Sequence, residues 1–145
     1  MKNKASHPIG ISISQIQADL HIADNCIQMA EKSSLKMAKP FKGQAGYHLQ
    51  QAAEKMIKIQ IYNSGITLDY SKLYKHGLDD LMIYSKNQGV VLMVPQYIRK
   101  HAYVISSWEA KGRYDLHMVV RIDVLKKAYS EIETWCNELI RCGYK

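Results

Sequence analysis

The strongest constraint on the fold is a run of apolar residues spaced three and four apart near the middle of the chain. The members of this run are Ala45, Leu49, Ala52, Ala53, Met56 and Ile59. Such spacing places side chains on one face of a helix. The run therefore predicts a helix over about residues 43–63, in which the small Ala52 and Ala53 let a second helix approach closely. Gly65 is expected to stop this helix, because glycine enters the left-handed backbone region freely.

Four further segments show the same periodicity. They cover about residues 14–32, 71–87, 95–111 and 123–141. Their apolar faces are Ile16, Leu20, Ala23, Ile27 and Ala30; Tyr74, Leu78, Leu81 and Met82; Ile98, Ala102, Ile105 and Trp108; and Leu125, Ala128, Tyr129, Ile132, Trp135, Cys136 and Leu139. Five amphipathic helices with short connections predict an all-α, five-helix, up-and-down bundle.

Local signals mark the ends of the predicted helices. Ser14 followed by Gln17 has the form of a capping box, in which each side chain bonds an amide of the first turn. Residues 39–41, which include a proline, are expected to break the chain between the first two helices. Pro95 suits the first turn of the fourth helix, where its missing amide costs nothing. Asp123 is expected to cap the fifth helix.

One segment, residues 90–94, is β-like by propensity, with the sequence Val-Val-Leu-Met-Val. No second segment reads as a strand that pairs with it, so it is expected to be a buried connection. Residues 1–145 are therefore predicted to form one helical domain. Its core is expected over about residues 14–141, preceded by an N-terminal extension of residues 1–13.

Composition excludes several classes of protein. No apolar run approaches the roughly 20 residues that span a bilayer, and residues 1–10 are polar, without the apolar core of a secretory signal. A cytoplasmic protein with no membrane association is expected. The three cysteines are odd in number and lack C-x-x-C spacing, which argues against a disulfide framework and a zinc site. The phosphate-binding and zinc-protease motifs G-x-x-x-x-G-K-[ST], G-x-G-x-x-G and H-E-x-x-H are also missing, so no cofactor and no metal are expected.

Charge points to an anionic partner. The net charge is +7, which makes nucleic acid or another anion a candidate ligand. Part of the excess of basic residues lies between residues 95 and 121, a segment with five Lys and Arg residues and two acidic residues. The alternative is an ordinary solvated basic surface.

Three motifs, in order, resemble those of the HEPN family. Residues Tyr47–Lys58, Tyr-His-Leu-Gln-Gln-Ala-Ala-Glu-Lys-Met-Ile-Lys, resemble the family's second helix, F-x-x-Q-Q-A-A-E-K-x-x-K. Residues Lys75–Leu81 resemble its H-D-L-x-x-L helix, and residues Glu109–Asp115 resemble its E-A-R-Y-P turn, which is expected to close the fourth helix. The three motifs lie within about residues 16–139.

The resemblance implies a HEPN-like bundle of four or five helices that often forms a homodimer. Family members are associated with nucleotide or RNA binding, and many are encoded beside a small nucleotidyltransferase. One branch consists of metal-independent ribonucleases that serve as toxins or in defence. Those enzymes carry an R-x(4–6)-H motif at the dimer cleft.

Ribonuclease activity would depend on Arg113 and His117. Cleavage without a metal needs a base for the 2′-hydroxyl proton and a cation near the phosphate, and His and Arg supply these groups. Three residues separate Arg113 from His117, fewer than the motif requires. The alternative is that Arg113 caps the fourth helix and His117 lies on the surface. His76 is expected to be a buried structural histidine.

Nucleotide or RNA binding would use surface cations for phosphate and aromatic rings for stacking. The candidate contacts are Arg99, Lys100, Lys111, Arg113, Arg121 and Tyr114, with further rings from Tyr97 and Tyr103. The predicted function is therefore that of a non-catalytic nucleotide- or RNA-binding module. The resemblance adds a nucleotidyltransferase as an expected partner. The alternatives are a ribonuclease toxin of a toxin–antitoxin pair and a structural bundle whose tyrosines contact another protein.

The polar side of the second predicted helix is expected to face solvent. It comprises Gln50, Gln51, Glu54 and Lys55, and Glu54 is spaced to pair with Lys58. The alternative is that these residues hold the helices of the bundle together.

Overall fold

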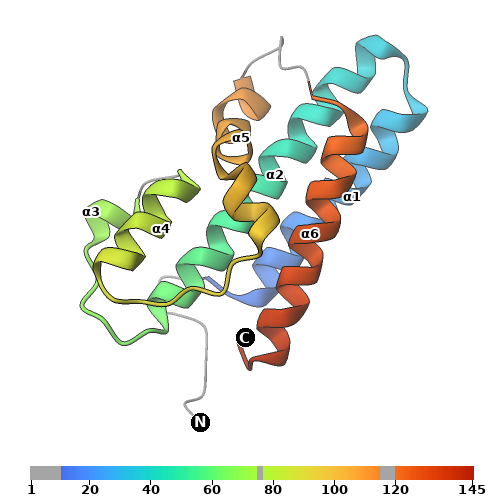
Figure 1. Ribbon diagram of the computed structural model, residues 1–145. Coiled ribbons are helices and arrows are strands. Elements are labelled where there is room, and N and C mark those ends of the chain that lie inside the picture. Colours follow the sequence, from blue (N-terminus) through green and yellow to red (C-terminus); the bar gives the residue numbers. More distant parts are fainter. Residues whose placement is uncertain (1–10, 75–76, 115–119) are drawn as a thin grey trace.

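The computed structural model describes residues 11–74, 77–114 and 120–145, and of residues 111–114 it describes the backbone alone (Figure 1). Within these ranges every regular element is a helix. The helices are α1 (Ile13–Lys32), α2 (Leu35–Tyr62), α3 (Tyr70–Leu73), α4 (Leu78–Asn87), α5 (Gln96–Tyr114) and α6 (Ile122–Arg141). The all-α prediction is confirmed, with a one-turn helix, α3, added to the five expected.

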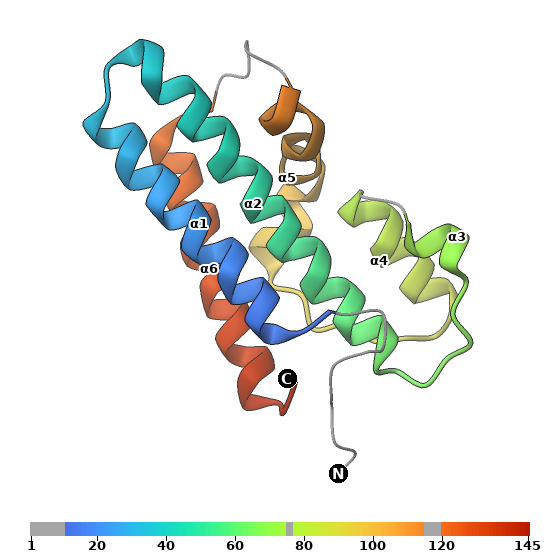
Figure 2. The same ribbon diagram turned by 180° about the vertical axis from the view of Figure 1, so that it is seen from behind.

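The longest helix, α2, lies at the centre of the bundle and contacts α1, α4, α5 and α6. The four long helices α1, α2, α5 and α6 run alternately up and down, and α3 and α4 form a separate edge beside α2 (Figures 1 and 2). The predicted stripe of α2 is completely buried, including both Ala52 and Ala53. The apolar face predicted for α1 is buried as well, and so is that of α6 except for the half-buried Tyr129.

The expected break at residues 39–41 is wrong, because Pro40 lies inside α2, which begins at Leu35. Ser34 caps this start by accepting a hydrogen bond from the amide of Met37. A proline in the second turn removes one amide, and the carbonyl that loses its partner belongs to Lys36. Lys36 and Pro40 are both exposed, so water can replace the missing donor.

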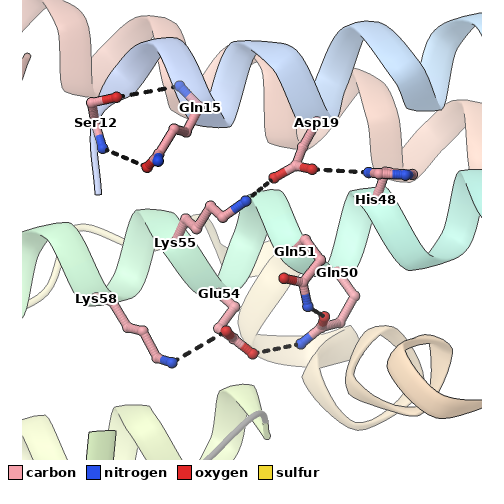
Figure 3. Close-up of polar contacts among 9 residues, drawn as sticks. All are labelled: Ser12, Gln15, Asp19, His48, Gln50, Gln51, Glu54, Lys55 and Lys58. Atoms are coloured by element: carbon pink, nitrogen blue, oxygen red, sulfur yellow. Dashed lines mark hydrogen bonds and ion pairs between the residues drawn. The ribbon is translucent and has the colours of Figure 1, made fainter. Parts of the chain in front are cut away.

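Two caps differ from the predicted ones by two residues. Helix α1 is capped by Ser12, and its capping box joins Ser12 to Gln15 rather than Ser14 to Gln17 (Figure 3). Helix α6 is preceded by Arg121, and Asp123 lies in its first turn. Its negative charge there interacts favourably with the positive end of the helix dipole. Both helices therefore start earlier than predicted, and no side chain caps the start of α6.

The helix predicted over residues 71–87 is interrupted. Helix α3 ends at Leu73 and α4 begins after Gly77, so Tyr74 is 75% exposed instead of buried. The amide of Leu78 donates to Oγ of Ser106 in α5 at 2.8 Å, a contact between distant segments that fixes the start of α4. Helix α5 also differs from its prediction, since it continues through the expected turn at residues 112–114.

The connection between α4 and α5 forms no strand, as expected, and side chains replace the missing strand partner. The carboxamide of Gln60 donates to the carbonyl of Met93 at 3.0 Å and accepts from the amide of Met93 at 2.8 Å. Nε1 of Trp135 donates to the same carbonyl at 2.7 Å. The connection is only partly buried, because Leu92 is covered while Val91 is 95% exposed.

Replacing Ala53 with leucine tests the packing of α2. Ala53 has no exposed surface, so the added methyl groups would overpack the core, and we expect a loss of about 1–3 kcal/mol in the free energy of unfolding. Urea unfolding followed by circular dichroism measures the loss. The matched control is Gln44→Leu on the exposed side of α2, which should change stability by less than about 0.5 kcal/mol. Equal stability of the two variants would contradict the placement of Ala53.

Candidate functional site

A row of buried polar side chains runs along α2. Gln50 is completely buried, Glu54 is 5% exposed and Lys58 is 8% exposed. Oε1 of Glu54 accepts from Nε2 of Gln50 at 3.1 Å, and Oε2 accepts from Nζ of Lys58 at 3.2 Å (Figure 3). Gln51 extends the row by donating to Oε1 of Gln50 at 2.7 Å. The expectation of a solvated polar face is therefore wrong for Gln50 and Glu54, although the predicted pair of Glu54 with Lys58 is confirmed.

A second polar cluster joins α1 to α2 on the other side of α2 (Figure 3). Both carboxylate oxygens of Asp19 are engaged. One lies 2.9 Å from Nδ1 of His48, and the other accepts from Nζ of Lys55 at 2.5 Å. For Lys55, the alternative expectation of an interhelical network is the one that the structure confirms.

The Asp19 cluster is suited to holding α1 against α2, whereas the bonds of the row from Gln50 to Lys58 lie within α2. The carboxylates of Glu54 and Asp19 each accept on both oxygens, and buried charges of this kind must be paired to be tolerated. In the part of the chain that the structure describes, no three His, Cys, Asp or Glu side chains gather as metal ligands.

Burial favours the neutral forms of several weak acids elsewhere in the bundle. It raises the pKa of Tyr62 to about 12, and Tyr70, Glu54 and Tyr74 raise it further through their charges. Burial also raises the pKa of the thiols of Cys26 and Cys136. A lowered pKa is what makes a thiol a good nucleophile at neutral pH, so Cys136 serves as a small buried side chain on the apolar face predicted for the last helix.

The structure places five of the predicted binding positions on one helix, α5. Arg99 and Lys100 are exposed there, and positions 111, 113 and 114 continue the same helix, with side chains outside the description. Nη2 of Arg99 donates to the carbonyl of Leu92 at 3.4 Å, and Nη1 donates to Sδ of Met82 at 3.8 Å. Arg121 is separate from this group, because it precedes α6 and pairs with Asp123.

The two side chains of the catalytic hypothesis lie outside the described part of the structure. The backbone of Arg113 is helical, but its side chain is not described, and His117 and His76 lie outside the described residues. The prediction that Arg113 and His117 act together on RNA thus stays a prediction.

Tyr103 was named in the sequence only as a further source of rings, outside the predicted binding residues. It is 81% exposed and lies one helical turn from Arg99. Tyr97, by contrast, is engaged within the protein, where its ring stacks on His101 at 4.2 Å between centroids and lies 5.7 Å from the Lys127 ammonium. The structure therefore distinguishes an exposed tyrosine from an engaged one, which the sequence alone could not do.

A groove of about 590 Å³ was also not foreseen. It lies between α4 and the connection that follows, and Arg99 of α5 forms part of its wall. The lining residues are Asp79, Met82, Ile83, Lys86, Val90, Val91, Leu92 and Arg99. Five of these lining residues are apolar and three are charged.

Comparisons of the chain with protein-family models, with curated proteins and with solved structures found no match. Among the described residues, no helix has the length and apolar character needed to cross a membrane.

Proposed function

We propose that this chain is a HEPN-like nucleotide- or RNA-binding module that uses the exposed side of α5 and has no catalytic activity of its own. One observation carries the proposal: the exposed ring of Tyr103 stands beside the exposed cations Arg99 and Lys100. No acidic residue occurs between residues 96 and 108, so nothing in that stretch repels a phosphate.

The chemistry of this surface matches a single-stranded nucleic acid or a nucleotide. Cations neutralise phosphates without regard to sequence, and an exposed tyrosine ring stacks on a base. Arg99 and Tyr103 are four residues apart on a helix and thus neighbours on its surface. Lys111, Arg113 and Tyr114 add further groups of the same types along α5.

The proposal includes no catalytic activity because Arg113 and His117 are too close together in the sequence for the ribonuclease motif. Arg113 and His117 are separated by three residues, and displacing a reacting group by about 1 Å can cost about 100-fold in rate. The ribonuclease and structural alternatives remain outcomes of the test below.

A small nucleotidyltransferase is the proposed protein partner, on the basis of the resemblance alone. Co-expression with such an enzyme encoded in a neighbouring reading frame should yield a complex by gel filtration. Separate elution of the two proteins would remove this part of the proposal.

Binding to single-stranded RNA should weaken steeply with salt and should depend on α5. We expect Arg99→Ala and Lys100→Ala each to reduce the slope of log K against log salt by about one. Tyr103→Ala should cost about 1–3 kcal/mol of binding free energy with little change in slope, because the ring stacks and carries no charge. Fluorescence anisotropy with a labelled oligonucleotide and with a labelled nucleotide measures both quantities and shows which ligand is preferred.

The matched control is Lys36→Ala, which removes one exposed cation at the start of α2 and should leave the slope unchanged. Intact RNA after incubation with a chelator is expected. Cleavage that is lost in His117→Ala would establish the ribonuclease alternative instead, and a lack of both binding and cleavage would favour the structural one.

A further inference from the structure

The connection between α4 and α5 has the character of an edge strand that lacks a sheet. Residues 90–94 have the sequence of a strand and contain no helix or turn, but no strand lies beside them among the described residues. Val91, within this connection, is 95% exposed, so its backbone as well as its side chain reaches solvent. A β-like segment left open in this way is a template for pairing with another chain.

The backbone groups of Val91 are open for such pairing. At Met93, by contrast, the carboxamide of Gln60 bonds both the amide and the carbonyl, as a residue on a neighbouring strand would. Among the described residues, no group bonds the amide or the carbonyl of Val91, or the amide of Leu92. Val91 can therefore form one pair of ladder hydrogen bonds with an added strand.

The groove of about 590 Å³ lies against this open backbone. Val91 forms part of its wall, together with the side chains of Met82 and Ile83, of which Ile83 is 58% exposed. None of the lining residues that the structure describes is aromatic, so they offer no ring on which a nucleic-acid base could stack. Alternate side chains of an extended peptide point to the same face, so a peptide with apolar residues spaced two apart would place them in the groove.

The charge of the groove favours an acidic peptide. Lys86 and Arg99 both line it and are both exposed, and Asp79 is the one acid among its described lining residues. The guanidinium of Arg99 is held at the wall by the carbonyl of Leu92 and by Sδ of Met82. Both of these partners are neutral, so they leave the positive charge of Arg99 available to a carboxylate.

We propose that this groove binds an extended, acidic segment of a partner protein by strand addition at Val91. The backbone of the segment bonds the amide and the carbonyl of Val91, its apolar side chains enter the groove beside Ile83, and its carboxylates lie at Lys86 and Arg99. In this mode of recognition main-chain bonds provide affinity, and side chains provide specificity. The inference is independent of RNA binding by α5, because it depends on the open backbone and on the groove.

A synthetic peptide tests the proposal. The probe is acetyl-Glu-Val-Thr-Val-Thr-Val-Glu-amide, and its control is the same peptide with lysine at both ends. In heteronuclear NMR spectra of the isotope-labelled chain, the acidic peptide should shift the amide signals of Val91 and Leu92 in a saturable way. The lysine-ended peptide should bind at least about tenfold more weakly, because it meets two cations and one acid.

Variants separate the backbone contribution from the charge contribution. Val91→Pro removes the amide and should weaken binding of the acidic peptide at least about tenfold. Its matched control, Val91→Thr, keeps the amide and should bind within about twofold of the wild type. Circular dichroism confirms that each variant retains its helices.

Lys86→Glu tests the charge of the groove without altering its backbone. It should weaken binding of the acidic peptide and strengthen binding of the lysine-ended one. Lys36→Glu makes the same charge change at the exposed start of α2 and should alter either affinity by less than about twofold.

Several results would overturn the proposal. One is the absence of any saturable shift at Val91 and Leu92 with the acidic peptide, and another is equal peptide affinity for the wild type, Val91→Pro and Lys86→Glu. Shifts of the same two amides with single-stranded RNA but not with the peptide would assign the groove to RNA. Shifts that appear on raising the protein concentration alone would assign it to a second copy of the chain.

Discussion

Replacing Glu54 with leucine is expected to lower the free energy of unfolding by about 3–5 kcal/mol. The substitution removes the acceptor for Nζ of Lys58 and for Nε2 of Gln50, and it leaves both donors buried. An unpaired ammonium in such surroundings loses its hydration without compensation, so the penalty is far larger than the value of an exposed pair. Urea unfolding at neutral pH, followed by circular dichroism, measures the difference.

The chain offers a matched control for this experiment in α6. Lys127 and Glu131 have the same i,i+4 spacing and lie 3.0 Å apart, but their side chains are 60% and 28% exposed. Glu131→Leu should therefore cost less than about 1 kcal/mol. Similar losses for Glu54→Leu and Glu131→Leu would show that the polar row of α2 is not buried in solution.

Replacing Trp135 with alanine is expected to cost about 3–5 kcal/mol. Its side chain is 1% exposed, and its indole nitrogen also holds the carbonyl of Met93. The alanine variant loses the packing and the hydrogen bond together. Trp135→Phe keeps most of the ring, so it should cost only roughly 1–2 kcal/mol.

Tyr103→Ala is the control for Trp135, because it also removes an aromatic ring but from an 81% exposed position. Its stability should stay within about 0.5 kcal/mol of the wild type. A Trp135→Ala variant that unfolds at the same urea concentration as Tyr103→Ala would contradict the packing of α6 against the core.

Periodicity was sufficient to find the long helices, because an apolar stripe at helical spacing has one stable arrangement, with the stripe buried. It did not predict the start of α2 or the start of α4. Pro40 suggested a break, yet an exposed proline early in a helix loses only one hydrogen bond that water can replace. The start of α4 depends on Ser106, almost thirty residues further along the chain, and no local pattern contains that contact.

The candidate site was less predictable than the fold. The residue types on α5 identified a basic surface with aromatic rings, and Arg99 and Lys100 are exposed as such a surface requires. The sequence could not distinguish the exposed Tyr103 from Tyr97, which stacks on His101. The burial of Glu54 was missed because polar residues on an amphipathic helix are usually solvated, whereas α2 is covered on several sides.

The position of α6 at the end of the described chain has a consequence for synthesis on the ribosome. Its buried stripe packs against α1 and α2, whose own sequences end at Tyr62. Translation at about 5–20 residues per second delivers Leu139 roughly 4–15 s after Tyr62. During that interval the nascent α1–α2 hairpin holds an apolar surface that α6 does not yet cover.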